Sequence, residues 1–192
     1  MRRTILSMAV LGLTCASPLA AQTRPPDPAS LIAAQRQAMT AFARMDGVWR
    51  GPAWSTTPNG RHEITQTERI GTFLGGSVRM IEGRGYNADG SVGFNALGII
   101  SFDPATNSYT ISSWAMGRGG VFPFRPTADG YEWEVPAGPG MTIHYSATVT
   151  ADTLREVGFL ARGDAPRVQI FEMNLRRVGT TDWPGAGAVP IR

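Results

Sequence analysis

The sequence predicts an all-β fold: an antiparallel up-and-down barrel of about ten strands, preceded by one helix. From Gly47 onward, short runs rich in β-branched and aromatic residues alternate with turn clusters such as Pro58-Asn59-Gly60. The connections are too short to hold crossover helices, so successive strands are expected to run antiparallel. A single open sheet of this size would leave two exposed edges, and closure into a barrel removes them.

Each predicted strand is bounded by turn residues and carries side chains that alternate between two faces. Apolar Ile143 and Tyr145 alternate with polar Thr142 and His144, which is typical of a strand with one buried face. The predicted strands cover residues 47–56, 61–70, 76–87, 91–102, 108–116, 121–125, 131–135, 141–150, 153–162 and 167–178.

A helix is predicted before the first strand. Asp27 is a candidate N-cap, and Pro28 suits the first helical position because the N–H that proline lacks would have no helical partner there. Gly47 is expected to end the helix. Its apolar stripe would pack on the barrel as a lid, and consists of Leu31, Ala34, Ala38, Phe42 and Met45.

Residues 1–21 have the order of a secretory signal peptide. Arg2 and Arg3 precede an apolar stretch, and small residues lead to a predicted cleavage site after Ala21. The apolar stretch is shorter than the about 20 residues needed to span a bilayer, and no later segment is apolar for long enough. We therefore expect a periplasmic or secreted protein without a membrane span. Lipidation at Cys15 is a weaker alternative, since Thr14 precedes it where a lipobox has Gly or Ala.

The chain is accordingly divided into a signal peptide (1–21), a linker and helix (22–46), a barrel domain (47–178) and an irregular tail (179–192). Cleavage would remove Cys15, the only cysteine, and with it any thiol chemistry or disulfide. All 18 basic residues are arginines, and the cleaved chain keeps 16 of them against 15 acidic residues. Because these arginines do not cluster, no nucleic-acid partner is expected.

Gly47-Val48-Trp49 resembles the Gly-x-Trp signature of lipocalins and related calycins. The resemblance implies that Trp49 plugs one end of the barrel, with Arg176 or Arg177 of the last strand across its ring in a cation–π contact. We take Arg176 as this partner. The wider chain is similar to a bacterial exported family of unknown function with a lipocalin-like barrel. That similarity covers most of residues 45–190 and is carried by residues 45–51, 65–69, 81–86, 101–106, 171–173 and 182–184.

Trp49-Arg50-Gly51 is also similar to the first strand of the haem-binding nitrobindin barrels, which reads Trp-x-Gly-x-Gly. Ala53 stands in place of the last glycine of that pattern. The final strand, residues 167–178, contains no histidine to serve as the iron ligand of that family. We therefore expect no cofactor, and haem binding stays an alternative.

Polar and aromatic residues inside the strands are candidate ligand contacts where their side chains face the barrel interior. A carboxylate that enters an apolar cavity must be paired or protonated, so strand glutamates draw attention. A pocket wall would add aromatic rings. The candidate set is Glu68, Glu82, Arg84, Trp114, His144, Tyr145, Glu172 and Asn174. These residues could instead point to solvent or form structural ion pairs.

Other motifs are read as structural features. His62 and His144 are the only histidines and share no local spacing, so no metal site is predicted. Gly83-Arg84-Gly85 indicates a strand bend or bulge, and residues 117–120 a flexible loop at the barrel mouth.

Three functions follow from this reading. The preferred one is a module that binds a small apolar or amphipathic molecule in the barrel. The second is an isomerase- or cyclase-type enzyme with Glu, Arg and His acid–base groups in the same cavity, for which no catalytic residue is assigned. The third is a structural protein with a filled barrel.

Overall fold

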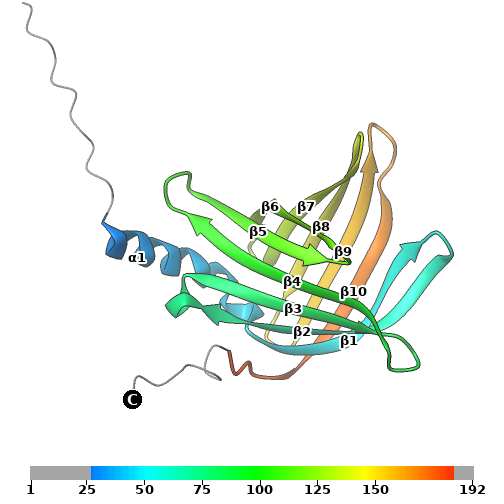
Figure 1. Cartoon of the computed structure of the whole chain (residues 1–192), viewed down its shortest axis with the longest axis horizontal. Coiled ribbons are helices and arrows are strands. Elements are labelled where there is room, and N and C mark those ends of the chain that lie inside the picture. Colours follow the sequence, from blue (N-terminus) through cyan, green and yellow to red (C-terminus); the bar gives the residue numbers. More distant parts are fainter. Residues whose placement is uncertain (1–26, 184–192) are drawn as a thin grey trace, which may run out of the picture.

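The computed structural model describes residues 27–183 of the chain, and within that range ten antiparallel strands close into a barrel (Figure 1). The predicted signal peptide lies outside the described residues. The strands are β1 (Gly47–Thr57), β2 (Gly60–Phe73), β3 (Val78–Tyr86), β4 (Val92–Asp103), β5 (Ser108–Ala115), β6 (Arg118–Pro126), β7 (Gly130–Gly138), β8 (Met141–Val149), β9 (Thr153–Arg162) and β10 (Val168–Gly179).

Each strand pairs with the next along the chain, and β1 pairs with β10 to complete the ring. This last pairing runs from Val48 opposite Gly179 to Ser55 opposite Phe171. The ring is least complete between β6 and β7, where only Phe124, Arg125 and Pro126 of β6 pair with β7. The closed antiparallel barrel confirms the predicted fold class.

The mouth loop predicted at residues 117–120 is wrong. Arg118 and Gly119 belong to β6 and pair with Ala115 and Trp114 of β5. Met116 and Gly117 alone form the turn, with φ angles of 50° and 77°. Two consecutive residues in the left-handed region make a tight hairpin turn whose twist suits the flanking strands, so the strands continue to the turn itself.

The N-terminal helix consists of α1 (Pro28–Met39), followed directly by a 3₁₀ segment, η1 (Thr40–Met45). Pro28 opens the helix as predicted, but the Asp27 side chain makes no capping hydrogen bond. In Figure 1, α1 leaves the barrel at the end opposite the β1–β2 hairpin. The predicted single helix up to Gly47 thus changes to the tighter 3₁₀ form in its last six residues.

Segment η1 closes one end of the barrel. Phe42 is buried and meets Tyr109 and Phe124 edge-on, each with ring centroids 5.3 Å apart. Trp49 is fully buried, and its indole N–H donates a hydrogen bond of 2.9 Å to the Met45 carbonyl. The helical lid and the Trp49 plug therefore form one packed unit.

Arg177, and not Arg176, lies across the Trp49 ring, with its guanidinium carbon 4.0 Å from the ring centroid. The Arg177 guanidinium also donates to the backbone carbonyls of Arg44, Asp46 and Ala151. Arg176 is exposed. Because side chains alternate across a strand, only one of two neighbouring arginines can face the plug, and the choice of Arg176 was wrong.

A second arginine ties the lid to the sheet. Arg79 of β3 is 2% exposed and forms a two-bond ion pair with Asp46, at 2.7 and 2.9 Å. Its third bond, of 2.7 Å, goes to the Met39 carbonyl at the end of α1. These bonds hold the lid on one end of the barrel. Within residues 27–183, no helix covers the opposite end, which carries the β1–β2 hairpin and is called the open end (Figure 1). Among the described residues, no helix has the length and apolar character needed to cross a membrane.

Candidate functional site in the barrel interior

Two polar side chains of β2 point into the barrel. Gln66 is 3% exposed and Glu68 is 8% exposed. The Gln66 amide donates a hydrogen bond of 2.7 Å to Glu68 Oε1, while the buried Glu68 Oε2 has no hydrogen-bond partner among the described residues. An unsatisfied buried oxygen is costly and rare in native proteins, so it calls for an explanation.

Two glycines of β3 make room for these side chains. A Cβ on Gly83 would lie 2.8 Å from Glu68 Oε1 and 3.1 Å from Gln66 Nε2. A Cβ on Gly85 would lie 2.4 Å from Ile64 Cδ1. The predicted irregularity is present as a register shift between Gly85 and Tyr86. The Gly83-Arg84-Gly85 motif has a further role, because it lets polar groups lie flat against the inner wall.

A second carboxyl group, Glu156 of β9, lies in the interior and is 7% exposed. The Trp133 indole N–H donates a hydrogen bond of 2.7 Å to Glu156 Oε1. Glu156 is absent from the sequence-predicted set. The signal that could have found it is the inward phase of its strand, since Leu154, Glu156 and Gly158 alternate with outward-facing residues.

Burial shifts the protonation of both acids. The pKa of Glu68 is raised to about 8, mainly by desolvation and in small part by the charges of Glu156 and Glu82, while the Gln66 hydrogen bond lowers it in part. Desolvation likewise raises the pKa of Glu156 to about 7, while hydrogen bonds from Trp133 and Tyr131 lower it in part. Each carboxyl can therefore gain or lose a proton near neutral pH, and their charges affect each other.

An aromatic layer lies next to the acids on the side of the open end. The strand registers place Trp133, Tyr145, Gly158 and Phe171 at one level, one inward position further from the lid than Glu156. The rings of Trp133 and Tyr145 stack at 4.5 Å, and a Cβ on Gly158 would lie 2.8 Å from Tyr145 Cε1. The three aromatic side chains are half-buried, so a molecule that enters from the open end meets them before the acids.

The eight residues predicted from the sequence as ligand contacts are divided between the inner and the outer face of the barrel. Glu68 and Tyr145 face the interior, whereas the other six lie on the outer wall and do not converge with them. Those six are Glu82, Arg84, Trp114, His144, Glu172 and Asn174.

The outer residues have partners on their own wall. Arg84 pairs with Glu82 at 2.6 Å. His144 Nδ1 lies 3.2 Å from Glu134, which rules it out as an anchor or a haem ligand inside the barrel. His62 is exposed near the tip of the β1–β2 hairpin. No group of three or more His, Cys, Asp or Glu side chains within residues 27–183 is placed to hold a metal ion.

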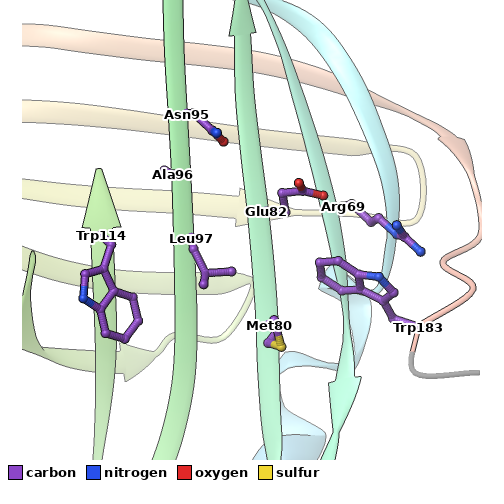
Figure 2. A pocket seen from close by; sticks show the side chains of 8 residues that line it. All are labelled: Arg69, Met80, Glu82, Asn95, Ala96, Leu97, Trp114 and Trp183. Carbon is purple, nitrogen blue, oxygen red and sulfur yellow. The ribbon is translucent and has the colours of Figure 1, made fainter. Parts of the chain in front are cut away.

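Trp114 borders a hollow of about 570 Å³ on the outer wall (Figure 2). Its indole lies over Gly119, where a Cβ would approach to 2.5 Å, and Trp183 flanks the opposite side. The Arg69 guanidinium lies 4.5 Å from the Trp183 ring centroid and pairs with Asp182. The charged groups of this hollow, Arg69 and Glu82, thus have partners, in contrast to Glu68 Oε2 inside the barrel.

No family model matches the sequence, and a search of the curated proteins found no match. Among solved structures, the crystal structure of Rv2717c from M. tuberculosis is similar, with a TM-score of 0.55 and 15% sequence identity. The similarity covers 73% of this chain and 96% of that chain. At this identity the likeness supports the barrel fold alone, and the predicted membership in an exported lipocalin-like family stays a prediction.

Proposed function

We propose that the barrel binds a small molecule whose apolar body lies against the aromatic layer and whose polar end reaches Glu68 and Glu156. The observation that carries the proposal is the unpartnered, buried Oε2 of Glu68. A buried oxygen without a hydrogen bond destabilises the native fold unless a ligand or an ordered water donates to it.

The composition of the interior supports this function. Ligand sites in proteins are lined mainly by apolar and aromatic side chains, with a few polar groups that fix the orientation of the ligand. Here Trp133, Tyr145 and Phe171 form the half-buried apolar part, with Tyr145 and Phe171 ring centroids 5.9 Å apart. The two acids supply the orienting groups.

The test is displacement of a fluorescent apolar probe, followed by native mass spectrometry of the complex. We expect Tyr145→Leu and Glu68→Gln to weaken probe or ligand binding by about tenfold, the effect of one well-placed contact. Glu82→Gln is the matched control, because Glu82 lies on the outer face of the adjacent strand. Equal binding by all three variants would place the ligand outside the barrel and overturn the proposal.

Acid–base catalysis in the barrel interior is a second candidate, favoured by two buried acids whose raised pKa values, about 8 and about 7, lie close to neutral pH. A pair of acids with different pKa values can act as acid and base at once. Cyclic ketones in D₂O provide the test: an isomerase-type site would exchange the protons next to the carbonyl, measured by NMR. Exchange that continues unchanged in Glu68→Gln and Glu156→Gln would exclude this role.

We also infer that the protein is exported and that the barrel binds its ligand after residues 1–21 have been removed. The order of charged, apolar and small residues at the start of the chain supports this. Protein recovered from the cell envelope should have the mass of a chain that begins at Gln22. A full-length mass, found in the cytoplasm, would contradict it.

A further inference from the structure

The two interior acids have no cationic partner. Among residues 27–183, neither Glu68 nor Glu156 forms an ion pair with an arginine or histidine. The arginines nearest the interior are already bound at the lid: Arg79 to Asp46, and Arg177 to backbone carbonyls. In the part of the chain that the structure describes, the interior therefore holds two acids that pair with no arginine or histidine.

The neighbours of these acids donate hydrogen bonds to them. Gln66 donates its amide to Glu68, and Trp133 donates its indole N–H to Glu156. A hydrogen bond with Tyr131 also lowers the pKa of Glu156, as expected of a donor to the charged form. Both carboxyls are thus arranged as acceptors, which favours the carboxylate form whenever a positive charge arrives.

The aromatic layer also suits a cation. The stacked rings of Trp133 and Tyr145 are half-buried and lie one position from Glu156 toward the open end. One face of each ring is covered by the other ring, so an ammonium group is attracted to an outer face of the stacked pair, and the attraction grows where water is excluded. The two acids have no cationic partner, and aromatic rings lie beside them. The site they form therefore favours a positively charged ligand.

We propose that the ligand of the barrel carries a basic nitrogen, as a protonated amine or amidine, which binds at Glu68 and Glu156 with its apolar body against Trp133 and Tyr145. This inference rests on the proposed binding function and specifies its ligand class. An ammonium group supplies the missing partner of Glu68 Oε2 as well as the missing positive charge. A carboxylate ligand would meet two acids and no cation to bind it, and a neutral alcohol would satisfy the oxygen without stabilising the carboxylate form.

Binding should change the proton count of the protein. At pH 7 the free interior holds bound protons, because burial raises the pKa of Glu68 to about 8. The other titratable groups around it are Glu156, Tyr131, Tyr145 and Glu82, whose charge makes the smallest contribution to the raised pKa of Glu68. Both tyrosines have a raised pKa and stay neutral. An incoming ammonium group stabilises the carboxylate form, so the complex should release a proton. A neutral ligand should release none.

The experiment compares three matched ligands: 2-phenylethylamine, 2-phenylethanol and 3-phenylpropionate, with naphthyl homologues of each. Calorimetric titration at pH 7, in two buffers of different ionisation enthalpy, measures affinity and proton release together. We expect the amine to bind about tenfold more tightly than the alcohol, with the carboxylate weakest. Glu68→Gln and Glu156→Gln should abolish the preference for the amine, and the outer-wall control Glu82→Gln should keep it.

The outcomes separate the two proposals. Equal affinity for amine and alcohol, without proton release, overturns the amine inference and leaves the binding function intact. The same holds if the fluorescent apolar probe binds and none of the three ligands displaces it. If neither the probe nor any ligand binds to a folded protein, the binding function itself fails.

Discussion

Glutamates of the inner and the outer wall differ sharply in this barrel, although they lie on neighbouring strands. Glu68 of β2 is opposite Gly83 in the ladder, one position from Glu82 of β3. Glu68 faces the interior, whereas Glu82 faces outward and pairs with Arg84 at 2.6 Å. One step along a strand thus moves a carboxyl group from an apolar interior to an ion pair at the surface.

The direction of the pKa shift differs between glutamates of the outer and the inner wall. Hydrogen bonds from Asn174, Arg155 and Gln169 lower the pKa of Glu172 on the outer wall. Desolvation raises the pKa of Glu68 and Glu156 on the inner wall. Protonation of Glu172 therefore affects stability at acidic pH, whereas protonation of Glu68 and Glu156 affects it near neutral pH. This difference can be tested by unfolding experiments.

The largest effect expected is the loss of stability as pH rises from 5 to 9. The folded pKa values of Glu68 and Glu156 lie above the usual 4.5, so the native state binds more protons than the unfolded state in this range. Stability should therefore be highest near pH 5 and fall through pH 7 to 8, by about 6 kcal/mol for the pair. Urea denaturation at pH 5, 7 and 9 measures it.

The double variant Glu68→Gln/Glu156→Gln is the control for this effect. It should remove most of the slope and exceed the wild type in stability at pH 9, since an amide pays no cost of ionisation. The outer-wall variant Glu82→Gln should keep the wild-type slope between pH 5 and 9. A wild-type slope in the double variant would mean that other groups carry the pH dependence.

A smaller loss of stability is expected when a glycine is replaced by alanine, and it should differ between the inner and the outer wall. Gly83→Ala would push a Cβ to 2.8 Å from the Glu68 carboxyl, which is confined by the sheet, and should cost about 1–2 kcal/mol. Gly119→Ala would press on the indole of Trp114, which is 49% exposed and can move outward. Its cost in thermal unfolding should be close to zero, and equal costs would contradict the difference in packing.

The barrel itself could be predicted from the sequence, because turn clusters and alternation are local signals. Which face of a strand looks inward could not, where both faces carry apolar groups. Leu97 and Met80 lie on the outer wall beside Glu82, so an apolar neighbour did not mark the interior. The face is decided by closure of β1 onto β10, a contact between residues more than a hundred positions apart.

The same reason explains the mistakes at the site. Arg176 and Arg177 are adjacent, and only the register of β10 against β1 decides which one meets Trp49. Glu156 was missed because its importance depends on Trp133 of another strand, which donates to it at 2.7 Å. Glu68 and Tyr145 were predicted from the residue types expected in a pocket, and their inward orientation is now supplied by the structure.

The smallest effect is expected on the outer wall, at the ion pair of Glu172 with Arg155. Glu172→Gln removes an interaction of 2.9 Å in which Arg155 is 55% exposed, so solvent screening limits its contribution to about 0.5 kcal/mol. The lowered pKa of Glu172 means that this stability is present above pH 4.5 and is lost as pH falls through the folded pKa. Denaturation at pH 7 and pH 3 should show the variant slightly weaker at pH 7 and equal at pH 3. A larger loss at pH 9 than at pH 7 would place Glu172 with the interior acids and break the distinction between the walls.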